Sequence, residues 1–315
     1  MSDHDPVLLR RLLELRQFPM FAGAELGELA MLAENVREIW YPAGAVIARP
    51  PALDAVHLIL SGRIDAGAQA HPAHRPFGVL EVLARRPLGA PAVAVGETRT
   101  LRLTAAELRE VLEDNFGLML ITLRELAGRT LAAGPVLAAG AVRSEGSATP
   151  AAPASLASPL GLVERMIVLR RQLPFTSAAP CGPPAERLGR APLEAIAILA
   201  HASQETTWPA GAVMARSGEP SRHVRFLLDG TVRVTRDEGE PYLLGSGSSL
   251  GVLESLAGAP HAGTVEVVAP VRALEVASSN IFDVLEDHTE LGFALIESLA
   301  GGLLDTAAAL EATTS

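Results

Sequence analysis

An internal repeat is the feature that most constrains how this chain can fold. Three segments recur in the same order, at offsets of 209 − 42 = 167, 230 − 62 = 168 and 251 − 78 = 173. Because the offset changes only at loops, the sequence predicts two copies of one domain. The paired segments are WYPAGAVIAR (Trp40–Arg49) with TWPAGAVMAR (Thr207–Arg216), VHLILSGRI (56–64) with VRFLLDGTV (224–232), and FGVLEVLARRP (77–87) with LGVLESLAGAP (250–260).

Composition separates the two copies. Residues 131–161 are rich in Ala, Pro, Ser and Gly and have no patterned apolar spacing, which is typical of a flexible linker. We therefore predict a first domain at residues 8–130 and a second at 162–312. A chain of 315 residues that is 49% hydrophobic is long enough for two cores.

Each copy changes its apolar period along its length. Helical spacing at 8–18 and 25–36, and again at 162–173 and 192–203, gives way to short alternating runs bounded by glycine and proline. A longer apolar helix is expected to close each copy, from Ala105 to about Arg129 and from Ser279 to about Leu310. The pattern predicts a mainly-β α+β fold, in which each domain is a small jelly-roll-like β-roll flanked by N-terminal and C-terminal helices.

Charge and residue usage exclude several classes of function. The net charge is −10 and every cation is an arginine, so the chain has no basic run for nucleic acid or an anionic membrane. The absence of lysine removes a Walker A motif, a kinase strand lysine and a Schiff base. No segment reaches the roughly 20 apolar residues of a spanning helix, so we expect a cytoplasmic protein without a membrane partner. The single cysteine, Cys181, is interpreted as a bystander.

The repeated segments together resemble the cyclic-nucleotide-binding domains of the catabolite activator and protein-kinase regulatory-subunit type. The resemblance rests on the order Y-P-A-G-x-V (W-P-A-G-x-V in the second copy), a strand ending L-x-G, and G-x-L-x-x-L-x-x-x-P, and it covers nearly all of both copies. In this family, a glycine, a short helix and an arginine hold the cyclic phosphate, and a glutamate binds the ribose. We call the segment that carries these positions the strap, at residues 77–92 in the first copy and 250–265 in the second.

The residues at the family's binding positions depart from its pattern. By resemblance, the pocket of the second copy comprises Gly251, Val252, Leu253, His261, Ala262 and Thr264, and the degenerate pocket of the first comprises Gly78, Val79, Leu80 and Leu88. The glutamate position is Val79 or Val252, and the arginine position is Leu88 or His261. Hydrogen bonds to charged groups contribute about 1.5–3 kcal/mol each, so two losses would weaken binding about 10²- to 10⁴-fold.

Alternatives remain open in the second copy. His261 is interpreted either as a turn residue or, when protonated, as a replacement cation for a small anion. Glu81 and Glu254 are expected to stabilise the first turn of a helix rather than bind ligand. The first copy also has a shorter hairpin, with 15 steps from Gly62 to Phe77 against 20 from Gly230 to Leu250.

The remaining histidines and helices suggest no chemistry. His71 and His74 are interpreted as residues of a solvated loop rather than metal ligands, since no Cys or acid accompanies them. The closing helices, with Leu291, Leu295 and Leu299 at four-residue steps, are expected either to pack on their own roll or to form a seam with a partner or a second copy. No DNA-binding helix-turn-helix follows the second copy.

The sequence therefore predicts a non-enzymatic regulatory protein of tandem cyclic-nucleotide-binding-like domains. We expect it to act through protein–protein interaction, with nucleotide binding weakened or lost. The alternative is a sensor that binds a cyclic nucleotide or another small anion in domain 2. No other cofactor and no metal are expected.

Overall fold

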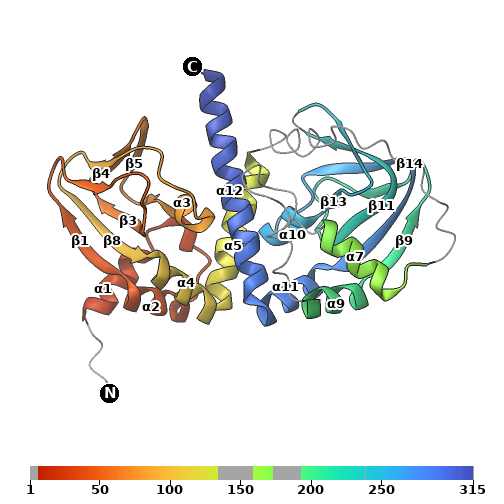
Figure 1. The fold of residues 1–315 in the computed structure, drawn as a ribbon, viewed down its shortest axis with the longest axis horizontal. Helices are drawn as coiled ribbons and strands as arrows, with labels where there is room; N and C mark the ends of the chain where they lie inside the picture. Colours follow the sequence, from red (N-terminus) through yellow and green to blue (C-terminus); the bar gives the residue numbers. More distant parts are fainter. Residues whose placement is uncertain (1–5, 134–158, 173–192, 238, 315) are drawn as a thin grey trace. The chain divides into compact units, whose positions relative to one another are not determined.

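The computed structural model describes residues 6–133, 159–172, 193–237 and 239–314 (Figure 1). The chain divides into two compact units, Met1–Thr122 and Leu123–Ser315, and each is treated by itself. The boundary falls within the helix Phe116–Ala132, which is given below with the elements of the first unit. Most of the predicted linker, and Cys181, lie outside the described residues. The predicted domain boundaries at 8–130 and 162–312 therefore remain predictions.

The first unit begins with helices and continues as two four-stranded antiparallel sheets. The strand orders are β1-β8-β3-β6 and β2-β7-β4-β5. The two sheets form the predicted roll. The elements are α1 (Pro6–Leu15), a 3-10 turn (Pro19–Phe21), α2 (Leu26–Asn35), β1 (Arg37–Tyr41), β2 (Val46–Ala48), β3 (Ala55–Ser61), β4 (Arg63–Ala66), β5 (Gln69–Pro72), β6 (Pro76–Phe77), α3 (Val79–Ala84), β7 (Ala92–Ala94), β8 (Thr98–Thr104), α4 (Ala105–Asp114) and α5 (Phe116–Ala132).

The second unit repeats this order with longer strands. Its sheet has six strands in the path β10-β14-β11-β12, with β13 paired to β11 and β9 paired to β14. β11 corresponds to β3 and β4 of the first unit, and β14 corresponds to β7 and β8. The elements are α7 (Leu162–Gln172), α9 (Leu193–Ala202), β9 (Gln204–Trp208), β10 (Val213–Ala215), β11 (His223–Arg236), β12 (Tyr242–Gly245), β13 (Ser249–Leu250), α10 (Val252–Ala257), β14 (Gly263–Ala277), α11 (Ser278–Asp287) and α12 (Thr289–Thr314).

A repeated glycine bends the long strand of each roll. Gly62 and Gly230 have φ of +83° and +88°. A Cβ atom at Gly62 would lie 2.5 Å from the Glu97 carbonyl oxygen, and one at Gly230 would lie 2.2 Å from the Pro270 carbonyl oxygen. Both the backbone conformation and the available space require glycine, which explains why this position is shared by the copies.

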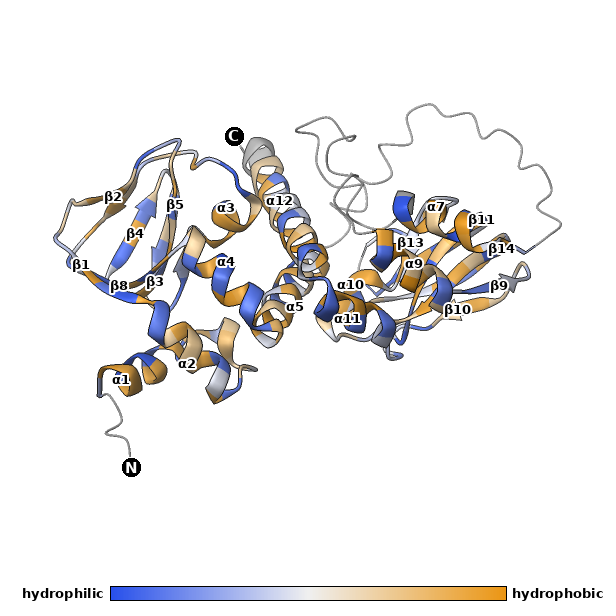
Figure 2. Cartoon of the chain, turned by 60° about the horizontal axis from the view of Figure 1, so that its bottom comes forward, coloured by the Kyte–Doolittle hydropathy of each residue, from blue (hydrophilic) through white to orange (hydrophobic). Residues whose placement is uncertain are grey.

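Apolar residues gather along the strands and helices of each unit (Figure 2). The core of the first roll contains Ile59, Ile64, Phe77, Leu88 and Ala92. The core of the second roll contains Met214, Ala215, Leu227, Val232, Val234, Val265, Val267, Val271 and Ala273. From Val232 to Thr235, buried residues of β11 alternate with exposed ones, as expected of a strand with one face buried.

The prediction of one continuous closing helix in each copy is wrong. Each consists of two helices, α4 and α5 in the first copy and α11 and α12 in the second, separated at Asn115 and His288. Asn115 ends one helix and begins the next, because its side-chain oxygen accepts a hydrogen bond from the Leu118 amide at 2.9 Å.

The long final helix also corrects an expectation about hydropathy. Within the described residues, Thr289–Leu310 is long and apolar enough to cross a membrane by length and composition, although we expected no such segment. Leu291, Leu295 and Leu303 on this helix are buried, whereas Leu310 is exposed. A buried core helix meets the same criterion, so this stretch is weak evidence for a membrane.

Candidate functional site

The strap of the second roll begins at Gly251. This glycine has φ of +80° and precedes the six-residue helix α10. A Cβ atom at Gly251 would lie 2.6 Å from the His223 carbonyl oxygen and 3.0 Å from Ser221 Oγ. The expected glycine followed by a short helix is present, and no other residue fits at its start.

His261 is held tightly by its backbone. Its amide donates to the Glu219 carbonyl at 2.8 Å, and its carbonyl accepts from the Gly218 amide at 3.0 Å. Only 8% of the residue is exposed. Burial lowers the pKa of its imidazole, opposed by Glu254 and assisted by Arg225. His261 is therefore harder to protonate than an ordinary histidine and is a poor replacement for an arginine.

The other predicted pocket residues separate into two groups. The ring of His261 lies beside Gly251, with Cε1 3.6 Å from the position of a Cβ atom there. Val252 is the first residue of α10, is half-buried, and also contributes to the lining of an apolar cavity on the helical side of the unit. The Thr264 hydroxyl accepts from the Ser217 amide at 3.2 Å. Leu253 and Ala262 are half-buried.

The same strap in the first roll is filled by an apolar side chain. Gly78 has φ of +82° and starts α3, but a Cβ atom there would lie 2.7 Å from Leu53 Cδ2. Leu88, at the arginine position, is 5% exposed and belongs to the roll's core. Val79 and Leu80 are half-buried in α3. An anion would meet hydrocarbon at this strap.

The first roll also corrects the interpretation of its histidines. His71 is not a solvated loop residue but a half-buried residue of β5, and its ring packs edge-on against Phe77 with centroids 5.2 Å apart. Burial lowers its pKa. His74 is exposed, and its ring lies 6.1 Å from that of Phe18. Within the described ranges, no three His, Cys, Asp or Glu residues gather in a group that could hold a metal.

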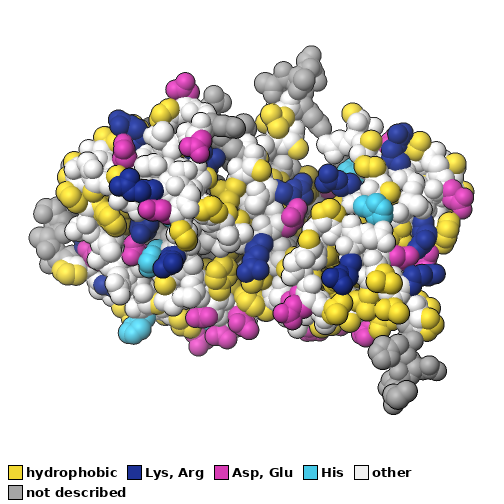
Figure 3. Space-filling model, turned by 180° about the vertical axis from the view of Figure 1, so that it is seen from behind, with side chains coloured by type: hydrophobic (Ala, Val, Ile, Leu, Met, Phe, Trp, Pro, Cys, Tyr) yellow, Lys and Arg dark blue, Asp and Glu magenta, His cyan; other side chains and the backbone are white. Residues whose placement is uncertain are grey.

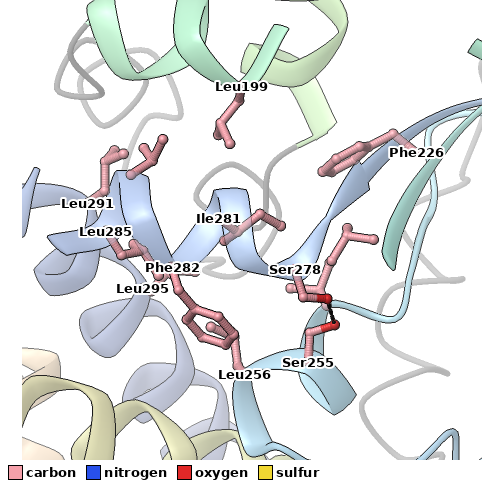
Figure 4. Close-up of a pocket in the computed structure, with 13 residues that line it drawn as sticks. Leu199, Phe226, Ser255, Leu256, Ser278, Ile281, Phe282, Leu285, Leu291 and Leu295 are labelled. Atoms are coloured by element: carbon pink, nitrogen blue, oxygen red, sulfur yellow. Dashed lines mark hydrogen bonds between the residues drawn. The ribbon is translucent and has the colours of Figure 1, made fainter. Parts of the chain in front are cut away.

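A cavity of about 30 Å³ lies on the helical side of the second unit (Figure 4). Figure 4 shows its apolar side chains converging from α9, α11, α12 and the end of α10. Its volume suits about one water molecule, far less than a nucleotide requires. The lining includes Leu199, Phe226, Leu256, Ile281, Phe282 and Leu295.

Hydroxyl groups beside this cavity connect the strap to the closing helices. Ser255 Oγ on α10 lies 2.8 Å from Ser278 Oγ at the start of α11 (Figure 4). Ser221 Oγ completes the group at 3.1 Å from Ser255 Oγ. We call these three residues the serine cluster. The equivalent positions in the first copy are apolar, with Leu53 (221 − 168), Val82 (255 − 173) and Ala105 (278 − 173).

Sequence reasoning missed an ion pair under the strap of the second roll. Arg225 Nε lies 2.6 Å from Glu275 Oε2, and its guanidinium lies 5.7 Å from the ring centroid of Trp208. At the position of Arg225, the first roll has His57 (225 − 168). Burial lowers the pKa of His57 to about 4, so this histidine is neutral at pH 7. Aligning the two copies by the repeat offset of 168 would have shown that an arginine in the second roll stands where the first roll has a histidine.

Arg236 was also missed, although the longer hairpin was noticed. Arg236 ends β11 and pairs in register with Gly263 of the strap. Its Cγ atom lies 3.1 Å from the position of a Cβ atom at Gly263. The signal was available in the sequence, because Val232, Val234 and Arg236 are spaced two apart along one strand.

Comparisons with known proteins find one domain family in part of the second unit. Residues 205–288 match the family model described as the cyclic nucleotide-binding domain. A 95-residue stretch, 30% of this chain, is 34% identical to a cyclic nucleotide-gated potassium channel of Mesorhizobium japonicum and covers 25% of that protein. The chain therefore spans about a quarter of the length of the curated relative it matches.

Two solved structures have similar lengths but weak similarity. A regulatory subunit of a cAMP-independent protein kinase A from Trypanosoma brucei, a mutant bound to cAMP, is 17% identical, with 92% of this chain and 93% of that chain covered and a TM-score of 0.33. The regulatory domain of Toxoplasma gondii protein kinase A with cAMP is 13% identical, with 98% of each chain covered and a TM-score of 0.34. These TM-scores are too low to carry an argument about this chain.

The fold and the repeat relate the two units to each other and to the matched domain. Each unit has a β-roll with flanking helices and a glycine-started strap. The family match lies in the second unit, and the first unit repeats its segments in order. Residues 205–288 are therefore similar to the cyclic nucleotide-binding domain, and the first unit repeats the same order of strands and helices.

Proposed function

We propose that this protein is a non-enzymatic regulatory protein that acts through protein contacts, with recognition of cyclic nucleotides lost in the first roll and weakened in the second. One observation carries the proposal: at the position where the family has an arginine, both straps hold a buried side chain without a full charge. Leu88 is 5% exposed and His261 is 8% exposed. Burial also lowers the pKa of His261.

Exposed apolar side chains on the first helix of each copy support contact with a protein partner. Val7, Leu9 and Leu13 on α1 are exposed, as are Val163 and Ile167 on α7. The closing helices, at which we also expect a seam with a partner or a second copy, bury Leu291, Leu295 and Leu303 and expose Leu310. On the face seen in Figure 3, arginine and acidic side chains are interspersed.

A second candidate function is a sensor that uses the second roll. The observation that favours it is the presence of ionisable groups around the second strap. Glu254, Glu219 and Arg225 all act on His261, whereas Leu88 takes its place in the first roll.

The test restores the missing charges in the full chain. Titration calorimetry with cyclic AMP would compare the wild type with Val252→Glu/His261→Arg. We expect the double variant to bind roughly 10²- to 10⁴-fold more tightly, since each restored charged hydrogen bond contributes about 1.5–3 kcal/mol. The control in the first roll, Val79→Glu, should gain nothing, and thermal unfolding verifies that this variant folds. Tight binding by the wild type, or no gain in the double variant, would contradict the proposal.

A further inference from the structure

The extra length of the second hairpin places an arginine over the strap. In the first roll, β4 ends at Ala66 and pairs with Gln69, so the chain turns at once. In the second roll, the equivalent pair is Val234 with Tyr242, and β11 runs on to Arg236. The added residues extend the strand until Arg236 pairs with Gly263.

Alternation along the strands places Arg236 on the inward face. Val232 and Val234 are buried, and the residues that follow each of them, Arg233 and Thr235, are exposed. Arg236 is half-buried. On the strap, His261, Gly263 and Val265 are buried at the same spacing. Arg236 therefore continues the inward row at the end of the roll where His261 lies.

Gly263 leaves space for this arginine. A Cβ atom at Gly263 would lie 3.1 Å from Arg236 Cγ and 2.7 Å from the Thr235 carbonyl oxygen. The first copy has Ala90 at this position (263 − 173) and Ala68 at the position of Arg236 (236 − 168). The second roll thus combines an arginine with a glycine that accommodates it, and the first roll has neither.

Tyr242 provides a hydroxyl group beside the guanidinium. It pairs with Val234 and so shares the inward face. Its pKa is raised mainly by burial, and Arg236 opposes the rise through its charge and a side-chain hydrogen bond. Glu254 on α10 acts on both Tyr242 and His261, so these groups surround the same end of the roll.

We propose that Arg236, with Tyr242, binds the charged group of a small phosphodiester anion at the strap end of the second roll, and so replaces the arginine that the strap has lost. The guanidinium offers a fork of donors that suits two phosphate oxygens. A monoanion fits better than a phosphate dianion, because Glu254 adds a nearby negative charge. This site rests on the sensor function proposed for the second roll.

The experiment uses the full chain and titrates cyclic AMP, with inorganic phosphate as the dianionic comparison. Arg236→Gln is expected to weaken cyclic AMP binding roughly 10- to 100-fold. The control is Arg233→Gln, which removes the same charge from the outward face of the same strand and should change affinity less than about threefold. Arg236→Lys should fall between wild type and Arg236→Gln, since it keeps the charge but not the fork. Thermal unfolding of each variant verifies that it folds.

A second background separates this site from the proposed function. In Val252→Glu/His261→Arg, the restored strap supplies the cation, so adding Arg236→Gln should weaken binding only slightly. Failure of this double variant to bind would overturn the proposed function. If the double variant binds, three results would each overturn the site at Arg236. The wild type could show no binding at millimolar cyclic AMP, or Arg236→Gln and Arg233→Gln could lose the same affinity for cyclic AMP. Inorganic phosphate could also bind more tightly than cyclic AMP.

Discussion

At the position where the family has its phosphate arginine, the first roll has Leu88 in a core with Ile59 and Phe77, and the second has His261 beside charged neighbours. Beneath the strap, the first roll has neutral His57, and the second has Arg225 paired with Glu275. At both positions, the first roll has an apolar or neutral side chain where the second roll has an ionisable or charged one. The same fold thus has apolar packing at this strap in one copy and ionisable groups around it in the other.

The largest expected effect comes from placing a charge in the filled roll. Leu88→Arg should destabilise the first unit by about 3–5 kcal/mol, because it buries an unpaired charge and removes core packing. His261→Arg should cost far less, since Glu254 and Glu219 lie near this position. Hydrogen exchange measured by mass spectrometry on the full chain would localise each loss to its unit. Equal losses in the two variants would show that the rolls do not differ in this way.

The second expected effect is the dependence of stability on pH that the buried His57 adds to the first roll. His57 has a pKa of about 4 in the folded chain against an ordinary value of 6.5, so the unfolded state binds more protons between these values. Stability should fall by about 3 kcal/mol as pH drops from 6.5 to 4. Urea denaturation across this range, with exchange readouts from β3, measures the change. His57→Gln should remove this part of the slope, and an unchanged slope would refute the assignment.

The third expected effect concerns the Arg225–Glu275 ion pair of the second roll, in which Arg225 takes the position of His57. Glu275→Gln should cost about 1.5–3 kcal/mol, because Arg225 is only 12% exposed and would lose a charged partner at 2.6 Å. Glu113→Gln breaks the exposed Arg109–Glu113 pair and should cost less than about 0.5 kcal/mol. Thermal unfolding compares the two. A negligible effect of Glu275→Gln would mean that the buried pair contributes no more than a surface pair.

The sequence predicted the elements well because repeat and period are local signals. Gly62 and Gly230 marked the bend in each roll, and Gly78 and Gly251 marked the start of each strap. The register between distant strands gave no comparable signal, so Arg236 was not seen to meet Gly263. The burial of His71 against Phe77 and the break at Asn115 also depended on packing and on a side-chain cap that period alone does not reveal.

The smallest expected effect tests whether hydroxyl groups distinguish the two copies near their closing helices. Ser278→Ala should cost about 1 kcal/mol, because it leaves Ser255 without one of its partners at 2.8 Å. Ser221→Leu/Ser255→Val/Ser278→Ala installs the apolar set of the first copy and should cost less than the single change, since no hydroxyl then remains unpaired.

Thermal unfolding of these two variants decides what the serine cluster does. A triple variant less stable than Ser278→Ala would mean that the three hydroxyls stabilise the second unit as a network. A triple variant close to wild type would make the cluster exchangeable with apolar packing. The link from strap to α11 would then depend on apolar packing in both copies, and the difference between the rolls would be confined to the ionisable groups around the strap.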